Sequence, residues 1–294
     1  MHMRIKAVLA ATLMSSLAAC SSLRTGEPLV IETYNPGESS IFPVSSSLIE
    51  GEHEIMLVDA QFQQNDAQEL VDLIRASGKK LTTIFISHGD PDYYFGLDVV
   101  SDAFPDAVVL SSPATREYIL SSMEAKNAHW GPILGNNAPE RLIVPDALQG
   151  DFLEVDSRKV QVMGLDGDDP KHTFLWIPSN RTVLGGVSVF DQQHVWMADS
   201  QTQEAREQWL QKLDDMLALH PETVIPGHYV GDSASNADAI RFTAQYITDF
   251  MAAEKLAGDS VDLTNSMIEQ YPNLGGEESL TLSAKVATGE MMWP

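Results

Sequence analysis

The stretch Leu81-Thr82-Thr83-Ile84-Phe85-Ile86, followed by Ser87-His88-Gly89-Asp90-Pro91-Asp92-Tyr93-Tyr94, decides how this chain is expected to fold. Its first half is apolar or β-branched and predicts a buried strand, which Gly-Asp-Pro-Asp must end. His88, Asp90 and Asp92 therefore fall on a loop at the carboxyl end of the strand, where binding and catalytic groups collect. One imidazole and two carboxylates so close together are suitable ligands for a divalent cation. The alternative is a turn in which the aspartates cap the next helix.

The same motif resembles a known family signature. His88-Gly89-Asp90-Pro91-Asp92-Tyr93 is similar to the His-x-His-x-Asp-His signature of the metallo-β-lactamase superfamily, with Asp90 and Tyr93 replacing two histidines. The resemblance spans about residues 45 to 230 and implies an α/β hydrolase fold, a four-layer αββα sandwich. The further matches, in chain order, are Leu57-Val58-Asp59, Gly167-Asp168-Asp169-Pro170, Leu184-Gly185-Gly186-Val187 and Val224-Ile225-Pro226-Gly227-His228.

The resemblance also implies a metal site, altered from that of the family. Val187 stands where the family has an aspartate that bridges two metals, and Tyr93 removes another ligand. We therefore expect one divalent ion, zinc, manganese or iron, since exchanging imidazole for carboxylate favours harder ions. Converging carboxylates would also repel one another unless a cation neutralised them. The implied ligands are His88, Asp90, Asp92, Asp168 and His228.

Two functions follow from this resemblance. In the first, a metal-activated water attacks an ester, lactone, thioester or amide bond, and Asp92 orients or deprotonates that water. Tyr93 is then a hydrogen-bond donor and His194 a proton donor or substrate contact, although both residues also suit a structural role. His172 is a possible replacement ligand. In the second, the protein is a catalytically inactive binding or scaffold member of the superfamily, as Val187 and Tyr93 indicate. The substrate and the oligomeric state stay open.

Composition narrows the partners. The net charge of −24 disfavours nucleic acid, because phosphate would be repelled and a basic surface is missing. A small-molecule partner is the expectation that remains. The 294 residues, 44% of them hydrophobic, are enough for a sizeable core.

The amino terminus predicts export. Arg4 and Lys6 precede an apolar stretch and then Leu17-Ala18-Ala19-Cys20, a pattern typical of a secretory signal. The four residues resemble a bacterial lipobox, which implies that Cys20 is lipidated and anchors the protein in the membrane. Ser21 after it resembles outer-membrane sorting, so we expect a cell-envelope lipoprotein that faces the periplasm or the exterior. The alternative is an ordinary cleaved signal in which Cys20 is incidental.

The patterns divide the chain into four segments: a signal peptide (1–19), a tether (20–43), a metallo-β-lactamase-like domain (44–232) and a helical extension (233–294). Residues 128–150 are expected to form a loop that overhangs the site, and His228 is expected on another loop. We expect strands at 44–49, 54–58, 81–86, 108–110, 152–155, 160–164, 173–177 and 181–184. Helices are expected from Asn65 to Gly78, after Gly96, from near Pro113, around Trp209, from Ser233 to about Leu256 and at 261–271.

Overall fold

Two β-sheets form the centre of the molecule, in a computed structural model that describes residues 28–167 and 169–293. The larger sheet has six strands in the order β1 to β6; pairing is antiparallel from β1 to β3 and parallel from β3 to β6. Parallel pairing places the ends of β3, β4 and β5 at one edge, so the loop after β4 lies beside that after β3. The strands are β1 (Val30–Tyr34), β2 (Ser46–Glu50), β3 (Glu54–Val58), β4 (Lys80–Ile86), β5 (Val108–Ser111) and β6 (Asp146–Ala147).

The second sheet has five strands in the order β12-β10-β9-β8-β7. Its pairing is antiparallel except between β10 and β12. A two-stranded parallel ribbon of β11 and β13 stands beside it. The strands are β7 (Phe152–Val155), β8 (Arg158–Met163), β9 (Phe174–Ile177), β10 (Thr182–Leu184), β11 (Phe190–Asp191), β12 (Thr223–Val224) and β13 (His228–Tyr229).

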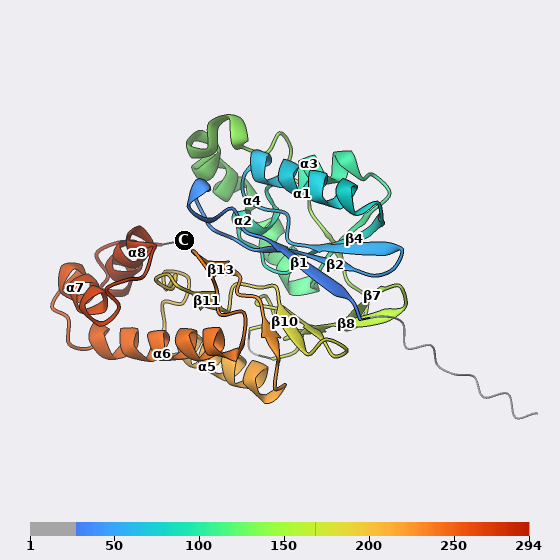
Figure 1. Cartoon of the computed structure of the whole chain (residues 1–294). Coiled ribbons are helices and arrows are strands. Elements are labelled where there is room, and N and C mark those ends of the chain that lie inside the picture. The colour runs from blue at the N-terminus through green and yellow to red at the C-terminus, as the bar shows by residue number, and fades with distance from the viewer. Residues whose placement is uncertain (1–27, 168, 294) are drawn as a thin grey trace, which may run out of the picture.

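Helices α1 and α3 lie outside the six-stranded sheet, and α5 and α6 lie outside the five-stranded sheet, so the expected αββα sandwich is confirmed (Figure 1). Helices α7 and α8 stand at one side of it, next to α6. One apolar cluster joins the two sheets, a second joins the six-stranded sheet to α1, α3 and α4, and a third joins the five-stranded sheet to α5 to α8. The helices are α1 (Gln64–Ser77), α2 (Pro91–Tyr94), α3 (Leu97–Ala103), α4 (Pro113–Leu134), α5 (Gln203–Ala218), α6 (Ala237–Glu254), α7 (Ser260–Gln270) and α8 (Glu277–Ala287), with short 3-10 turns at Gly37–Ser39 and Gly135–Asn137.

Local sequence explains the β3-α1-β4 unit that positions the motif. The apolar residues of α1 recur at helical spacing, and Leu70, Val71 and Ile74 are buried against the sheet. Gly78 ends the helix in the left-handed conformation, which glycine adopts without strain. The expected start at Asn65 is displaced: the residue before the helix is Gln63, and Asn65 lies inside the first turn.

The expected loop at 128–150 is wrong in its first part. Helix α4 continues to Leu134, through Gly131 and Pro132, because apolar packing supports its last turn. Trp130 does not overhang the site; its ring meets those of Phe42 and Phe62 edge-on, with centroids 5.2 and 5.5 Å away. The indole is therefore partly buried and packs against the apolar cluster between α4 and the six-stranded sheet.

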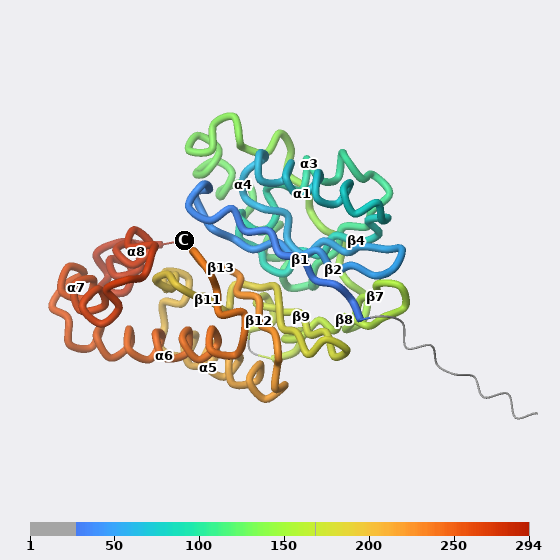
Figure 2. Tube along the Cα trace, in the orientation of Figure 1, coloured from blue at the N-terminus to red at the C-terminus, as the bar shows by residue number. Residues whose placement is uncertain are grey.

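The helical extension is present, with different boundaries (Figure 2). The long helix begins at Ala237 after the cap Asn236, because the Ser233 hydroxyl is committed to Asp191, to which it donates at 2.9 Å. A further helix, α8, follows α7, and the sequence patterns do not predict it. His228 is also not on a loop: it forms β13, paired with Phe190 of β11.

Residues 1–27 lie outside the described part of the chain, and so do the expected signal, the lipobox and Cys20. In the part of the chain that is described, no helix has the length and the apolar character that a membrane span requires.

Candidate functional site

The motif loop is held by a buried carboxyl at the end of β3. Asp59 accepts hydrogen bonds from the Ser87 amide at 2.8 Å and the Ser87 hydroxyl at 2.6 Å. The same hydroxyl accepts the Gly186 amide at 2.7 Å, and Thr173 donates to the Ser87 carbonyl at 2.9 Å. Burial raises the pKa of Asp59 to about 8, against the effect of the Ser87 bonds, so the carboxyl is largely protonated at neutral pH. Ser87 thus ties the strand ends of the two sheets together, directly before His88.

His88 and Asp90 are in contact, and a lysine completes the group. His88, only 2% exposed, donates through Nε2 to Asp90 Oδ2 at 2.9 Å. Asp90 Oδ1 accepts from Lys126 Nζ of α4, which also donates to the Tyr118 hydroxyl at 3.0 Å. Burial would raise the pKa of Asp90, but His88 and Lys126 outweigh it and hold the pKa well below its ordinary value. Asp90 is therefore ionised and neutralised by protein groups.

Asp92 and His228 form a second pair. Asp92 Oδ2 lies 3.2 Å from His228 Nε2, and both residues are at least nine-tenths buried. The His228 ring stacks on Phe190 of the neighbouring strand, with centroids 5.1 Å apart. Strand pairing and stacking therefore fix the imidazole that the sequence places after Pro226-Gly227.

Tyr93 lies between these two groups. Its ring meets those of His88 and His228 edge-on, at centroid distances of 5.2 and 5.7 Å. The hydroxyl is buried and no described residue is hydrogen-bonded to it. Burial, with nearby Asp92 and Asp59, raises the pKa of Tyr93 well above its ordinary value, so the phenol keeps its proton. Val187 packs against the apolar clusters of both sides and offers no polar atom.

A third group joins the loop before β9 to α5. His172 Nδ1 contacts the Asp169 carboxylate, and Lys212 Nζ donates to the Asp169 carbonyl at 3.0 Å and the His172 carbonyl at 2.5 Å. Burial lowers the pKa of His172 to about 4, although Asp169 acts in the opposite direction. The ring is therefore neutral at pH 7, and it stacks on His88 with centroids 4.8 Å apart. Asp168, the predicted ligand, lies outside the described residues.

The first and third of these groups border one pocket through His88, Asp90, Asp169, His172 and Lys212. We call it the His88 pocket; its volume is about 230 Å³, and the pair of Asp92 and His228 is not part of its lining. Its wall also carries Asp199, which accepts indole N–H groups from Trp196 at 2.5 Å and Trp293 at 2.9 Å. Burial, with Asp90 nearby, raises the pKa of Asp199. The pocket is lined by His88, Asp90, Asp169, Lys171, His172, Val187, Ser188, Trp196, Asp199, Ser200, Ala205, Gln208, Trp209 and Lys212.

His194 does not line this pocket. Only 2% exposed, it is packed behind the ribbon of β11, where its Nδ1 lies 2.9 Å from the Tyr246 hydroxyl of α6. Burial lowers the pKa of His194 to about 4, so the ring is uncharged at neutral pH. This position suits the structural role that the sequence left open for His194. The other expectation, a proton donor or substrate contact, has no contact with the His88 pocket to support it.

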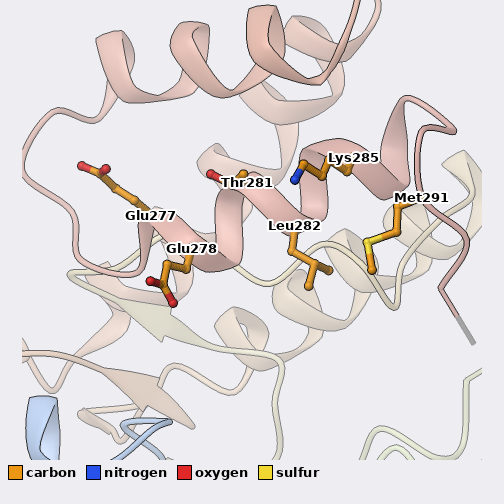
Figure 3. A pocket seen from close by; sticks show the side chains of 6 residues that line it. All are labelled: Glu277, Glu278, Thr281, Leu282, Lys285 and Met291. Carbon is orange, nitrogen blue, oxygen red and sulfur yellow. The ribbon is translucent and has the colours of Figure 1, made fainter. Parts of the chain in front are cut away.

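A larger pocket of about 410 Å³ lies on α8, away from the motifs (Figure 3). Figure 3 shows its wall of Glu277, Glu278, Thr281, Leu282, Lys285 and Met291. None of these residues belongs to a motif described above.

A model of the metallo-β-lactamase superfamily matches residues 40–228, which include every motif described above. The chain belongs to the metallo-β-lactamase superfamily. Members of this superfamily typically use divalent metals, usually zinc. The match ends at His228, so the helices α6 to α8 lie beyond it.

Solved structures of the superfamily share the fold. A metallo-β-lactamase family protein from Thermus thermophilus aligns with a TM-score of 0.60 at 18% identity, over 88% of this chain and 93% of that one. A metallo-β-lactamase from Pontibacter korlensis aligns with a TM-score of 0.56 at 15% identity, over 75% of this chain and 93% of its own. In sequence, the chain is 32% identical to the uncharacterized protein YobT of Bacillus subtilis (strain 168) over 73 residues, 25% of this chain and 31% of YobT. The matched part thus spans about a third of that relative.

The described residues, as they are placed, do not fit a metal ion. Within residues 28–167 and 169–293, no three His, Cys, Asp or Glu side chains are grouped so that they could hold one. The candidate ligands instead contact other side chains of the protein: Asp90 contacts His88 and Lys126, and Asp92 contacts His228. The metal-ligand set therefore stays a prediction, and Asp168 of that set lies outside the described residues.

Sequence patterns missed the two lysines that neutralise the site. Lys126 lies on α4 and Lys212 on α5, far from the motifs in sequence. In sequence, both lysines lie on helices whose polar residues are typical of a solvent-exposed face. No sequence spacing predicts that Lys126 contacts Asp90 or that Lys212 contacts Asp169. The physical signal was the predicted crowding of carboxylates, which calls for a cation of some kind.

Proposed function

We propose that this protein binds a small anionic molecule in the His88 pocket through its own side chains, without a resident metal ion. The observation that supports this most is the ion pair of Asp90 with Lys126, backed by His88. Lys126 already gives Asp90 the positive partner that a metal would supply, so a ligand beside Asp90 needs to meet protein groups alone.

The unsatisfied donors of the pocket indicate the charge of the ligand. Lys212 is committed to Asp169 and His172, whereas Lys171 has no described carboxylate partner and lies over the Tyr118 ring at 4.9 Å. The hydroxyls of Ser188 and Ser200 line the same wall, and no described residue is hydrogen-bonded to them. A carboxylate or phosphate group would accept from these donors, and a lysine facing a low-dielectric pocket attracts an anion strongly.

The shape of the pocket limits the size of the ligand. A volume of about 230 Å³ is below the usual range for drug-sized ligands, so a metabolite-sized molecule fits better. Trp196 and Trp209 form apolar walls on which a ring or an alkyl chain can pack. The ligand class is therefore a small acid with an apolar body.

The test is a binding screen in the presence of a chelator. Small carboxylates and phosphate monoesters are titrated into the metal-free protein by calorimetry, and Lys171→Met is expected to weaken the binding of a hit by about tenfold or more. Lys159→Met is the matched control, because Lys159 lies over the Phe152 ring at 4.1 Å, outside the pocket. Equal weakening by both variants, or the absence of any hit, would contradict the proposal.

The second candidate is the metal-dependent hydrolase of an ester, lactone, thioester or amide that the superfamily suggests. Asp92 and His228 favour it, because they lie 3.2 Å apart at positions matching family ligands and are not paired with a described lysine or arginine. Such an enzyme would use one zinc, manganese or iron ion. Metal analysis of the purified protein beside His88→Ala, together with assays on simple esters and lactones with added metal, separates the two. A stoichiometric ion that His88→Ala removes, with metal-dependent turnover, would favour the hydrolase.

A further inference from the structure

Lys126 is surrounded by oxygen atoms in a manner that resembles a bound cation. Its Nζ contacts Asp90 Oδ1, lies 3.0 Å from the Tyr118 hydroxyl and 3.5 Å from the Gly89 carbonyl oxygen. The ammonium also lies 4.4 Å from the centroid of the Tyr118 ring. Three oxygen donors from two segments of chain therefore converge on one positive charge.

The surroundings of this ammonium contain a nitrogen donor as well. Asp90 Oδ2 accepts from His88 Nε2 at 2.9 Å, so the carboxylate links the imidazole to the lysine. The side chains of Lys126 and Asp90 are each 20% exposed, and His88 is 2% exposed. Screening by solvent is weak at such a site, and removing the lysine would leave Asp90 with much of its charge uncompensated.

We propose that Lys126 is a built-in cation that excludes a divalent metal from the loop of His88 and Asp90, and that its removal converts this loop into a metal site. Asp90, the Gly89 carbonyl and His88 supply the donors in the altered protein. Carboxylate and carbonyl oxygens with one imidazole suit manganese among the first-row ions. The inference concerns the metal affinity of the loop and does not depend on the ligand proposed above.

The structure makes the lysine and the metal alternatives for the same carboxylate. A divalent ion bound to Asp90 Oδ1 would lie within contact distance of the Lys126 ammonium, and like charges at that distance repel strongly in a partly buried site. The wild-type loop therefore binds a metal poorly, although it keeps donors at positions that match the superfamily signature. Lys171 approaches the same Tyr118 ring, at 4.9 Å, and has no ion pair with Asp90, so it provides a matched control.

The experiment compares Mn²⁺ binding by equilibrium dialysis and electron paramagnetic resonance in wild type, Lys126→Met and Lys171→Met. Lys126→Met is expected to bind about one ion at least about tenfold more tightly than wild type, while Lys171→Met behaves as wild type. Asp90→Asn added to Lys126→Met is expected to abolish the gain. A folded Lys126→Met that binds Mn²⁺ no more tightly than wild type would overturn the proposal. So would a gain in Mn²⁺ affinity that persists when Asp90→Asn is added.

A measurement on the wild-type protein covers the case in which Lys126→Met does not fold. Mn²⁺ broadens the NMR signals of nuclei well beyond its own ligands, so broadening of the His88 and Tyr118 ring signals reports on occupation of the loop only where Asp90→Asn abolishes it. In wild type these signals are expected to be broadened by one equivalent of Mn²⁺ no more than in Asp90→Asn. Broadening in wild type that Asp90→Asn abolishes would show that Lys126 does not exclude the metal. Lys126→Gln, which keeps an amide beside Asp90 and removes the charge, then replaces the methionine variant in the dialysis experiment.

Discussion

Acidification should destabilise the protein in part through His194. The ring is 2% exposed and burial lowers its pKa to about 4, from the ordinary value of 6.5. Because the folded-state pKa is lowered, the unfolded chain binds a proton before the folded protein does. The stability that His194 contributes is therefore present above pH 6.5 and is lost as the pH falls from about 6.5 to about 4.

The size of the effect follows from the two pKa values. A difference of about 2.5 corresponds to about 3 kcal/mol when the pH is below both, and to about 2 kcal/mol on going from pH 7 to pH 5. The hydrogen bond with Tyr246 acts in the same direction: Nδ1, 2.9 Å from the hydroxyl, can accept from it while neutral and loses this capacity when protonated.

The assay is urea unfolding followed by tryptophan fluorescence, at pH 7 and pH 5, for wild type and His194→Gln. Glutamine does not titrate. The difference in the free energy of unfolding between wild type and His194→Gln is therefore expected to be about 2 kcal/mol smaller at pH 5 than at pH 7. The comparison of variants is needed because Asp59 works in the opposite sense: its raised pKa makes it favour folding as the pH falls. His53→Gln, at an exposed histidine in the turn before β3, is the control, and its difference from wild type should change far less. A difference for His194→Gln that stays constant or grows at pH 5 would refute the account of a dry, neutral ring.

Three further predictions concern packing and location. Gly227→Ala should lower the free energy of unfolding by about 3 kcal/mol, because a Cβ there would lie 2.2 Å from the Gly186 carbonyl oxygen. The control Gly131→Ala in α4 should leave that free energy unchanged or raise it by up to about 1 kcal/mol, and thermal or urea unfolding measures both. Trp130→Ala should cost about 3 kcal/mol while leaving ligand binding in the His88 pocket unchanged; an unaltered stability would mean that the indole is not core. Cys20→Ala should shift the protein from the membrane fraction to the soluble fraction, and equal partitioning would exclude lipid anchoring.

The sequence predicted most of the sheet core because its strands are continuous apolar runs between strong turn signals. The run before Ser87 became β4, and Glu54 to Val58 became β3 as expected. Gly78 ends its helix in the left-handed conformation that favours glycine, and Gly96 stands before the next helix, where a Cβ would lie 2.2 Å from the Ala60 carbonyl oxygen. The order of motifs around these elements was enough to predict the αββα sandwich, which the structure confirms.

The site was less predictable because its contacts join residues far apart in the chain. The sequence identified His88, Asp90, Asp92 and His228, which the structure places in two close His–Asp contacts. It did not predict that Lys126 would reach Asp90, because that contact depends on how α4 packs against the sheet. Trp130 and His194 show the same limit. Each was expected near the site, yet Trp130 packs against Phe62 at the edge of the apolar core, and His194 is buried beside Tyr246.

The lysines resolve the electrostatic difficulty that the sequence raised. Carboxylates gathered at strand ends require a cation, and the structure provides one for Asp90 from α4 and one for Asp169 from α5. These two helices belong to opposite outer layers, so the charge balance of the pocket depends on the packing of the whole sandwich. A metal ion would have to displace Lys126 to share Asp90, because the carboxylate cannot neutralise both at short range. The metal affinity of this loop therefore depends on how stable the contact between Lys126 of α4 and Asp90 is.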